Sequence, residues 1–350
     1  MRFMRIIKPG LFTTIQDRGR FGHQKSGIPV AGAMDEYALR VGNLLVGNAE
    51  NEACLEMTFV GPTIEFLANG LVALTGGDLG AVLNNTNIES WQSFAVKQGD
   101  SLRFTGAKNG SRGYLALAGG LKLPEVMGSK STYLLAHIGG LDGRALCEGD
   151  ELEINQQTDK PVPPARAVPA EFRKVQVNPQ TVRVIMGPQD EAFTDKGIRT
   201  FFDGEYKVTH ESDRMGCRFE GPKIQHKNGP DIVSDGIAPG SIQVVGSGMP
   251  IVMMADRQTT GGYTKIATVI TPDLWKLAQA RTGDSFKFSA ISVDEAQELY
   301  REYENAIRQL PEKMMPVNIE TDVPSGIKQV LLVRVADKEY RVEIQEMTKQ

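Results

Sequence analysis

Short apolar segments bounded by glycine or proline set the main limit on how this chain folds. Four such segments, at residues 72–75, 114–118, 182–186 and 242–245, are only four or five residues long. That length suits a strand and is too short for a stable helix. The 37 glycines among 350 residues provide the turns that many short strands require. The pattern predicts a mainly β fold of closed barrels or sandwiches with a few short helices.

Three helices are indicated by the signals at their ends. Asp35 can cap a helix that runs toward Gly47, and Thr271 can cap a second one with proline at its first position. Ser292 and Glu295 form a capping box that begins a third helix. Near the end of the chain, residues 330–345 alternate between apolar and polar side chains, which predicts a β-hairpin that turns at residues 337–338.

A proline-rich segment separates two halves that contain similar short sequence segments. A Gly-Asp turn followed by apolar alternation occurs at residues 99–104 and again at residues 283–288. Asp17-Arg18 in the first half likewise matches Asp213-Arg214 in the second, although chance similarity of common turn sequences is the alternative. The predicted organisation is a domain over residues 1–160, a linker over 161–180, a second domain over 181–310 and an extension with a hairpin over 311–350.

A polar run that directly follows an apolar strand is the strongest candidate for a functional site. Residues 253–265 pass from two methionines into Asp, Arg, Gln, two Thr, two Gly, Tyr, Thr and Lys. Burying so many polar groups is costly unless they pair with each other or with a ligand. Asp256 could orient Arg257 or accept a proton, and Arg257 and Lys265 could stabilise an oxyanion or a phosphoryl group. The alternative is an ion-pair network that braces a turn.

A second polar run, residues 14–29, lies near the N-terminus. In one interpretation it is a solvated loop in which Asp17 pairs with Arg18 or Arg20. In the other, its arginines clamp a carboxylate or a phosphate, because a guanidinium group offers a planar fork to such anions. Asp213 and Arg214 present the same two alternatives in the second half.

Charge and missing motifs exclude several classes of function. The formal net charge of −4 argues against a general nucleic-acid or anionic-membrane surface. No phosphate-binding GxxxxGK[ST] motif, dinucleotide-binding glycine motif or zinc-binding histidine cluster is present, so no metal site is expected. No lysine is flanked by methionines, so the chain is not expected to carry biotin itself.

The cellular compartment is inferred from cysteine usage and from the lack of membrane segments. Cys54, Cys147 and Cys217 are widely spaced, which indicates a reducing compartment, and all three are expected to be buried. No apolar run approaches the ~20 residues needed to span a bilayer, and the first residues lack a signal-peptide core. A soluble, cytoplasmic protein is expected.

Taken together, these segments resemble the KipA-type family, also called allophanate hydrolase subunit 2 or the biotin-dependent carboxyltransferase subdomain. The resemblance covers roughly residues 5–310 and includes the two polar runs described above. The other segments that carry it are residues 8–11, 32–35, 43–48, 55–58, 114–120, 129–133, 139–144, 187–190 and 212–216.

The resemblance implies two cyclophilin-like β-barrel domains and a role as the C subunit of a bacterial 5-oxoprolinase. That complex would contain a KipI-like B subunit together with a hydrolase A subunit, would use ATP with Mg to convert 5-oxoproline to glutamate, and would be active only when assembled. One alternative is a carboxyltransferase that takes a carboxyl group from biotin on another chain to urea or a similar amide. Another is a non-enzymatic KipA-type antagonist of a kinase inhibitor.

The expected catalytic residues are Asp256, Arg257 and Lys265, with Asp256 as a base or orienting group. The expected substrate-binding residues are Gln16, Asp17, Arg18, Ser26, Asp213, Arg214, Gln243, Gln258, Thr259 and Tyr263. For this site to work, charged groups from both halves must converge around one carbonyl group of the substrate.

Overall fold

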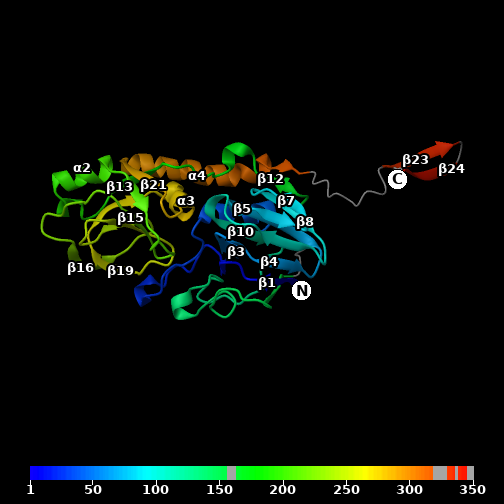
Figure 1. Cartoon of the computed structure of the whole chain (residues 1–350), viewed down its shortest axis with the longest axis horizontal. Helices are drawn as coiled ribbons and strands as arrows, with labels where there is room; N and C mark the ends of the chain where they lie inside the picture. Colours follow the sequence, from blue (N-terminus) through cyan, green and yellow to red (C-terminus); the bar gives the residue numbers. More distant parts are fainter. Residues whose placement is uncertain (156–162, 318–328, 336–337, 345–350) are drawn as a thin grey trace. The chain divides into compact units, whose positions relative to one another are not determined.

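The computed structural model of the chain describes residues 1–155, 163–317, 329–335 and 338–344. Residues 1–317 form one compact unit, and residues 318–350 belong to a second unit. The described part of the chain is mainly β with four α-helices, which confirms the predicted fold class (Figure 1).

Two sheets make up the N-terminal half. The first contains, in spatial order, β11 (Glu151–Glu153), β1 (Arg2–Lys8), β4 (Thr63–Phe66), β9 (Ser101–Phe104), β6 (Ala81–Leu83) and β7 (Thr86–Ile88). The second contains β2 (Phe12–Gln16), β3 (Cys54–Thr58), β10 (Asn109–Leu117), β5 (Gly70–Asp78), β8 (Gln92–Val96), β12 (Arg166–Ala167) and β22 (Met315–Pro316). Neighbouring strands in both sheets are antiparallel. The Gly-Asp turn at residues 99–100 leads into β9, as predicted.

The C-terminal half is a closed barrel of seven strands. Their order is β13 (Gln180–Met186), β20 (Lys265–Val269), β17 (Ser241–Val244), β18 (Pro250–Met253), β15 (Gly216–Glu220), β14 (Tyr206–Val208) and β21 (Ser285–Ala290). The parallel pairing of β21 with β13 closes the barrel. A separate two-stranded ribbon, β16 (Asp231–Gly236) with β19 (Thr260–Tyr263), projects from it.

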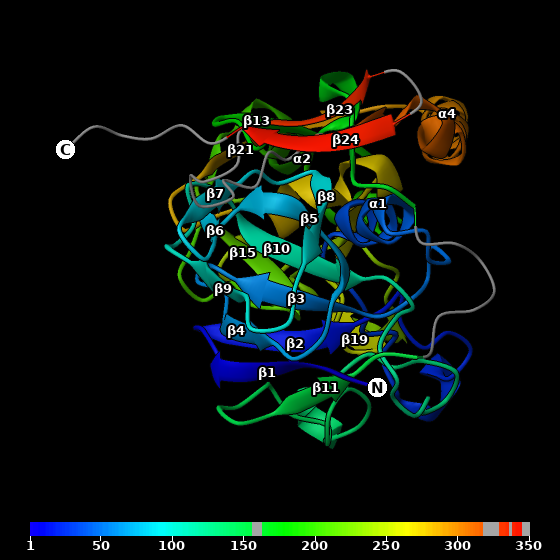
Figure 2. The ribbon, with the colours of Figure 1, turned by 90° about the vertical axis from the view of Figure 1, so that its right-hand side faces the viewer.

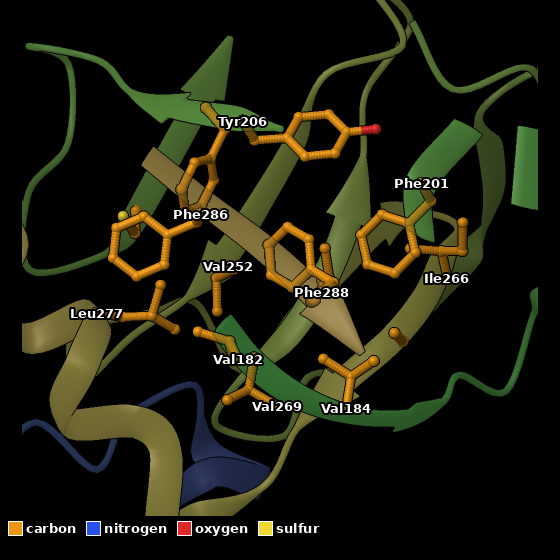
Figure 3. Packing of buried hydrophobic residues seen from close by; sticks show 14 of the residues in the cluster. Val182, Val184, Phe201, Tyr206, Val252, Ile266, Val269, Leu277, Phe286 and Phe288 are labelled. Carbon is orange, nitrogen blue, oxygen red and sulfur yellow. The ribbon is translucent and has the colours of Figure 1, made fainter. Parts of the chain in front are cut away.

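Aromatic and β-branched side chains fill this barrel. Figure 3 shows Phe201, Phe286 and Phe288 among the inward-pointing valines of the surrounding strands. The rings of Phe201 and Phe288 stack with their centroids 4.7 Å apart. The barrel therefore has a packed core and is not a channel, so a ligand has to bind at its ends or its outer surface.

Helix α1 (Glu36–Leu45) begins as predicted, because the Asp35 carboxylate accepts a hydrogen bond from the Ala38 N–H at 3.0 Å. Helix α4 (Val293–Lys313) begins with the predicted capping box of Ser292 and Glu295. At 21 residues it is longer than the short helices that the sequence indicated. Both helices bury apolar residues in one cluster. Helix α1 packs against β5, and α4 lies beside α1 (Figure 2).

The other two helices differ from the prediction. Helix α3 (Leu274–Ala278) follows a 3-10 turn at Thr271–Asp273, and Thr271 makes no capping hydrogen bond, so its assignment as a cap is wrong. The Asp273 carboxylate instead pairs with Arg183 at 2.6 Å, and this contact holds the turn. Helix α2 (Asp195–Asp203) was not predicted; its apolar side chain Phe201 becomes buried only in the folded barrel.

Two further segments of the prediction have a described structure. Strands β23 (Gln329–Val335) and β24 (Lys338–Ile344) pair antiparallel, which confirms the hairpin. Lys338, predicted to lie in the turn, is instead the first residue of β24 and pairs with Val335; residues 336–337 lie outside the described residues. Residues 163–180, assigned to a linker, include β12, which pairs with β8. Among the cysteines, Cys54 and Cys217 are buried, whereas Cys147 is exposed, contrary to the prediction, because it lies in the turn that leads to β11.

Candidate functional site

A buried ion-pair network centred on Arg214 joins the two halves of the molecule. The Arg214 guanidinium donates to both carboxylate oxygens of Asp256, each at 2.9 Å. It also donates to the Glu56 carboxylate and, at 2.6 Å, to the Gly32 carbonyl oxygen. The three charged side chains are each at most 9% exposed. Burial lowers the pKa of Arg214, but the two carboxylates outweigh that effect and hold the pKa above its ordinary value.

The backbone explains why these side chains meet. Arg214 lies two residues before β15 and Asp256 three residues after β18, and these two strands are antiparallel neighbours in the barrel. The Asp256 N–H donates to the Arg214 carbonyl oxygen at 2.9 Å, which continues the ladder past the strand ends. Glu56 comes from β3 of the N-terminal half. Asp256 therefore orients Arg214 and not its sequence neighbour Arg257.

The network continues through Glu56 to helix α1. The second oxygen of Glu56 accepts hydrogen bonds from the Tyr114 hydroxyl at 2.7 Å and from the Met34 N–H at 2.8 Å. The Tyr114 hydroxyl in turn accepts from the Asp35 N–H. Gln279, in the C-terminal half, donates to the Asp35 carboxylate at 2.7 Å. Polar contacts thus cross between the two halves at both ends of the network, which fixes their relative position.

These contacts between the two halves, from Arg214 to Gln279, form a seam. The stability of this seam is expected to depend on pH through Asp35. Burial, and to a smaller extent the nearby Glu56 charge, outweigh the favourable contacts with Gln279, Ala38 and Lys174 and raise the pKa of Asp35 from 3.8 to about 6. The folded state therefore holds this proton more tightly than the unfolded state does. The resulting stabilisation is complete below pH 4 and is lost as the pH rises through about 6.

The measurement compares the wild type with Asp35→Asn, which cannot titrate. The free energy of unfolding of the wild type minus that of Asp35→Asn, both from urea denaturation, should fall by roughly 2–3 kcal/mol between pH 4 and pH 7. A difference that stays constant or grows over this range would contradict the assignment.

Asp17 forms a second buried cluster, with a loop of the N-terminal half. Its carboxylate accepts hydrogen bonds from the hydroxyls of Ser129 and Ser131, from the Lys130 N–H at 2.6 Å and from the Gly19 N–H at 2.7 Å. Neither of the predicted pairings, with Arg18 or with Arg20, is formed. Seryl and backbone donors satisfy the carboxylate because β2 places it directly against residues 129–131.

Arginines 18 and 20, next to this cluster in the sequence, differ in burial and in their partners. Arg18 is 37% exposed and pairs with Glu36 at 2.7 Å. Arg20 is fully buried and donates to the Ser131 carbonyl oxygen, while its Nε and Nη1 have no partner among the described residues. Gln16 is also buried; its Nε2 donates to Thr14 and to the Thr132 carbonyl oxygen.

Arg257 lines a cavity of about 350 Å³ between the two halves. Its Nε donates to the Ile237 carbonyl oxygen and its Nη1 to the Met254 carbonyl oxygen, both at 3.1 Å. Burial lowers the pKa of Arg257 to about 10. The cavity is otherwise formed mainly by apolar and aromatic side chains, with Arg18 and Glu36 as its other charged groups.

Lys265 lies at a third place, at the foot of the β16–β19 ribbon. Its ammonium group donates to the Asp235 carboxylate at 2.7 Å and to the Gly236 carbonyl oxygen at 3.1 Å. Lys265 holds the pKa of Asp235 below its usual value. Gln243 is buried on the neighbouring strand β17, and its Nε2 donates to the Tyr263 carbonyl oxygen at 3.4 Å.

The structure thus distributes the predicted residues instead of gathering them around one point. Asp256 pairs with Arg214, and Asp17 accepts hydrogen bonds from residues 129–131. Arg257 and Arg18 both line the cavity. Lys265 and Arg257 bond to the consecutive carbonyls of Gly236 and Ile237, but only Arg257 lines the cavity. The remaining predicted residues, Ser26, Asp213, Gln258, Thr259 and Tyr263, are exposed or partly exposed on turns and on the ribbon.

Several residues of these clusters were not predicted. Glu56 carried a usable signal, because it is a charged residue between Leu55 and Met57 in an apolar strand. Gln279 and the aromatic side chains of the cavity, Tyr37, Trp275 and Tyr303, carried none. Their role depends on contacts between segments far apart in the sequence.

No cluster of three or more His, Cys, Asp or Glu that could hold a metal ion occurs among the described residues. Within that same part of the chain, no helix is long and apolar enough to cross a membrane.

Comparison with known proteins finds a protein family and relatives that match most of this chain. The family model for the carboxyltransferase domain, subdomains A and B, matches residues 26–290. The chain is 37% identical over 307 residues to the C subunit of 5-oxoprolinase from Escherichia coli K12, an alignment that covers 88% of this chain and 97% of the relative. It is 40% identical over 298 residues to the C subunit of 5-oxoprolinase from Haemophilus influenzae, covering 85% and 94%.

A solved structure shows the same fold over nearly the whole chain. The urea carboxylase of Kluyveromyces lactis is similar with a TM-score of 0.83 and 29% sequence identity. The similarity covers 98% of this chain and 32% of the larger enzyme.

Proposed function

This chain belongs to the carboxyltransferase domain family, subdomains A and B, and on that basis we propose that it is the C subunit of a 5-oxoprolinase. The complex would convert 5-oxoproline, ATP and water to glutamate, ADP and phosphate in the cytoplasm. The observation that carries the proposal is the extent of the match, which spans 97% and 94% of two relatives that bear this name.

The cavity beside Arg257 supports this proposal chemically. The substrate, 5-oxoproline, is a small ring that carries a carboxylate and an unreactive amide. A buried guanidinium group is a suitable partner for the carboxylate, and apolar walls suit the ring. Opening the amide also needs activation of its carbonyl oxygen. Lys265 and the Asp256–Arg214 pair, which the sequence suggested for this step, do not line the cavity, so we do not assign the step to them.

The residues of this chain fit ATP and Mg poorly, so we assign the nucleotide to another protein of the complex. No carboxylate cluster suitable for a metal ion occurs in residues 1–155 and 163–317. In the cavity, Glu36 already pairs with Arg18, which leaves Arg257 alone to face a triphosphate. The proposed partners are a KipI-like B subunit together with a hydrolase A subunit, and the isolated chain is expected to be inactive.

The test is reconstitution of the complex from purified proteins. The complete mixture of this chain, the KipI-like protein and the hydrolase protein should form glutamate from 5-oxoproline only when ATP is present. Omitting this chain should reduce the rate to background. If the complete mixture shows no ATP-dependent glutamate formation, the proposal is wrong.

A carboxyltransferase role is the second candidate, favoured by the family itself and by the similarity to the Kluyveromyces lactis urea carboxylase. Biotin on another chain would then be the carboxyl donor and urea or a similar amide the acceptor. Incubation with a carboxylated biotin carrier and urea distinguishes the two candidates, because only this second role gives a carboxylated product. Tight binding of the KipI-like partner without turnover in either assay would instead indicate a KipA-type antagonist.

A further inference from the structure

We infer that the cavity beside Arg257 binds a compact monocarboxylate, with Arg257 as the residue that pairs with the carboxylate. The cavity is formed by both halves of the chain, with Val30 and Tyr37 on one side and Met254 and Trp275 on the other. The carboxylate class follows from the cavity alone. Naming the ligand as 5-oxoproline rests on the proposed function.

Arg257 is a buried cation without an acidic partner in the described part of the chain. Its side chain is only 4% exposed, and within residues 1–155 and 163–317 it forms no ion pair with a carboxylate. Two backbone carbonyls hold its Nε and Nη1 but supply only partial charges. A buried cation is usually compensated by an acidic partner, because removing a full charge from water is costly.

Other buried arginines of this chain show the usual arrangement. Arg40 is equally buried and pairs with Glu50 and Glu304, each at 2.7 Å. Arg214 pairs with two carboxylates, as described above. Arg20 also lacks a carboxylate partner within the described part of the chain, but it does not line this cavity. Of the buried arginines that the structure describes, Arg257 alone combines an uncompensated charge with space for a ligand, so the missing partner has room to be a bound anion.

The walls of the cavity are mainly apolar. Tyr37, Trp275 and Tyr303 supply aromatic surface, and Val30 and Leu274 supply aliphatic surface. The other cation of the cavity, Arg18, is already paired with Glu36. One free positive charge in an apolar pocket favours a ligand with a single negative charge on a compact apolar body.

This charge pattern distinguishes substrate from product under the proposed function. 5-Oxoproline carries one carboxylate on a neutral ring. Glutamate adds a second carboxylate and an ammonium group, and the charged groups that could meet them, Arg18 and Glu36, are already paired with each other. The cavity should therefore bind 5-oxoproline more tightly than glutamate, which would favour release of the product.

The experiment titrates the purified full-length chain by calorimetry with four probes. 5-Oxoproline and cyclopentanecarboxylate, which share a ring and a carboxylate, should both bind. 2-Pyrrolidinone, which has the ring without the carboxylate, and glutamate should bind at least tenfold more weakly. If the carboxylates bind no more tightly than 2-pyrrolidinone, the inference is overturned.

Two variants test the location of the site. Arg257→Gln should weaken carboxylate binding at least tenfold, whereas Arg218→Gln, which removes an exposed charge outside the cavity, should leave it unchanged. Ala238 is exposed at the edge of the cavity, so Ala238→Trp fills the space while it retains Arg257 and requires no repacking of the core. It should also abolish binding. Unchanged affinity in either folded variant would overturn the inference.

The reconstituted complex separates this inference from the proposed function. If the complex hydrolyses 5-oxoproline and Arg257→Gln leaves its KM unchanged, the inference fails while the function stands. If the complex is inactive but the isolated chain binds cyclopentanecarboxylate through Arg257, the function fails while the carboxylate site stands.

Discussion

Replacing Arg214 by methionine is expected to lower the free energy of unfolding by roughly 3–5 kcal/mol, because the change leaves two buried carboxylates without their counter-ion. Glu56 and Asp256 would then face each other across the seam with no cation between them. The loss is large because water does not reach these groups to replace the guanidinium. Urea denaturation at pH 7 measures it directly.

Arg18→Met provides the matched control, since Arg18 occupies the corresponding place in the first Asp-Arg pair of the sequence. Its contact with Glu36 is a partly exposed ion pair, so its loss should cost no more than about 1 kcal/mol. Similar losses for the two variants would contradict the central role assigned to the Arg214 network.

A further variant tests whether the ion pairs themselves stabilise the fold, or whether the loss in Arg214→Met comes only from carboxylates left without a cation. Replacing Arg214 by methionine, Glu56 by glutamine and Asp256 by asparagine together should restore much of the stability lost in Arg214→Met, because no charge then remains buried and the glutamine oxygen can still accept hydrogen bonds from Tyr114 and Met34. If the triple variant is less stable than Arg214→Met, the ion pairs themselves and not the imbalance hold the two halves together.

Local signals in the sequence were sufficient to predict much of the secondary structure. The Asp35 cap and the Ser292–Glu295 capping box depend on residues within one turn of each other, and both are present. Helix α2 could not be predicted in this way. Its nine residues include a glycine, and it is held in place by Phe201, which packs against Phe288 of a distant strand.

The candidate site was harder to predict because its contacts are not local. Asp256 and Arg257 are adjacent in the sequence, yet one faces the seam and the other faces the cavity. The strand pairing of β15 with β18 determines this outcome, since it brings Arg214 to Asp256. The sequence identified the polar run correctly but contained no information on which partner each charge would find.

The two matching Asp-Arg pairs, Asp17-Arg18 and Asp213-Arg214, also show that a local sequence does not determine the partners of a charged residue. Asp213 lies on the surface and accepts hydrogen bonds from the N–H groups of Met215 and Gly216 in its own turn. Asp17 is buried, and most of its donors come from residues 129–131. Equivalent residues in the two halves thus have different surroundings, and in each half a different member of the pair, Asp17 or Arg214, is buried.

Replacing Asp17 by alanine is therefore expected to lower the free energy of unfolding by about 3 kcal/mol or more. The change leaves the hydroxyls of Ser129 and Ser131 and the Lys130 N–H without an acceptor, and each unsatisfied buried group costs about 1–3 kcal/mol. The loop at residues 129–131 should lose protection in particular. Faster amide hydrogen exchange at Lys130, together with urea denaturation, measures both effects.

Asp213→Ala is the control for this change, because it removes the matching aspartate from a surface turn where water can replace the lost contacts. It should cost less than about 1 kcal/mol and leave exchange at Lys130 unchanged. Asp17→Asn should fall between the two, since an amide oxygen can still accept from two of the donors while its NH₂ group opposes the others. If Asp17→Ala is no more costly than Asp213→Ala, the cluster around Asp17 contributes little to the fold, and its buried carboxylate would have to be explained by binding or catalysis instead.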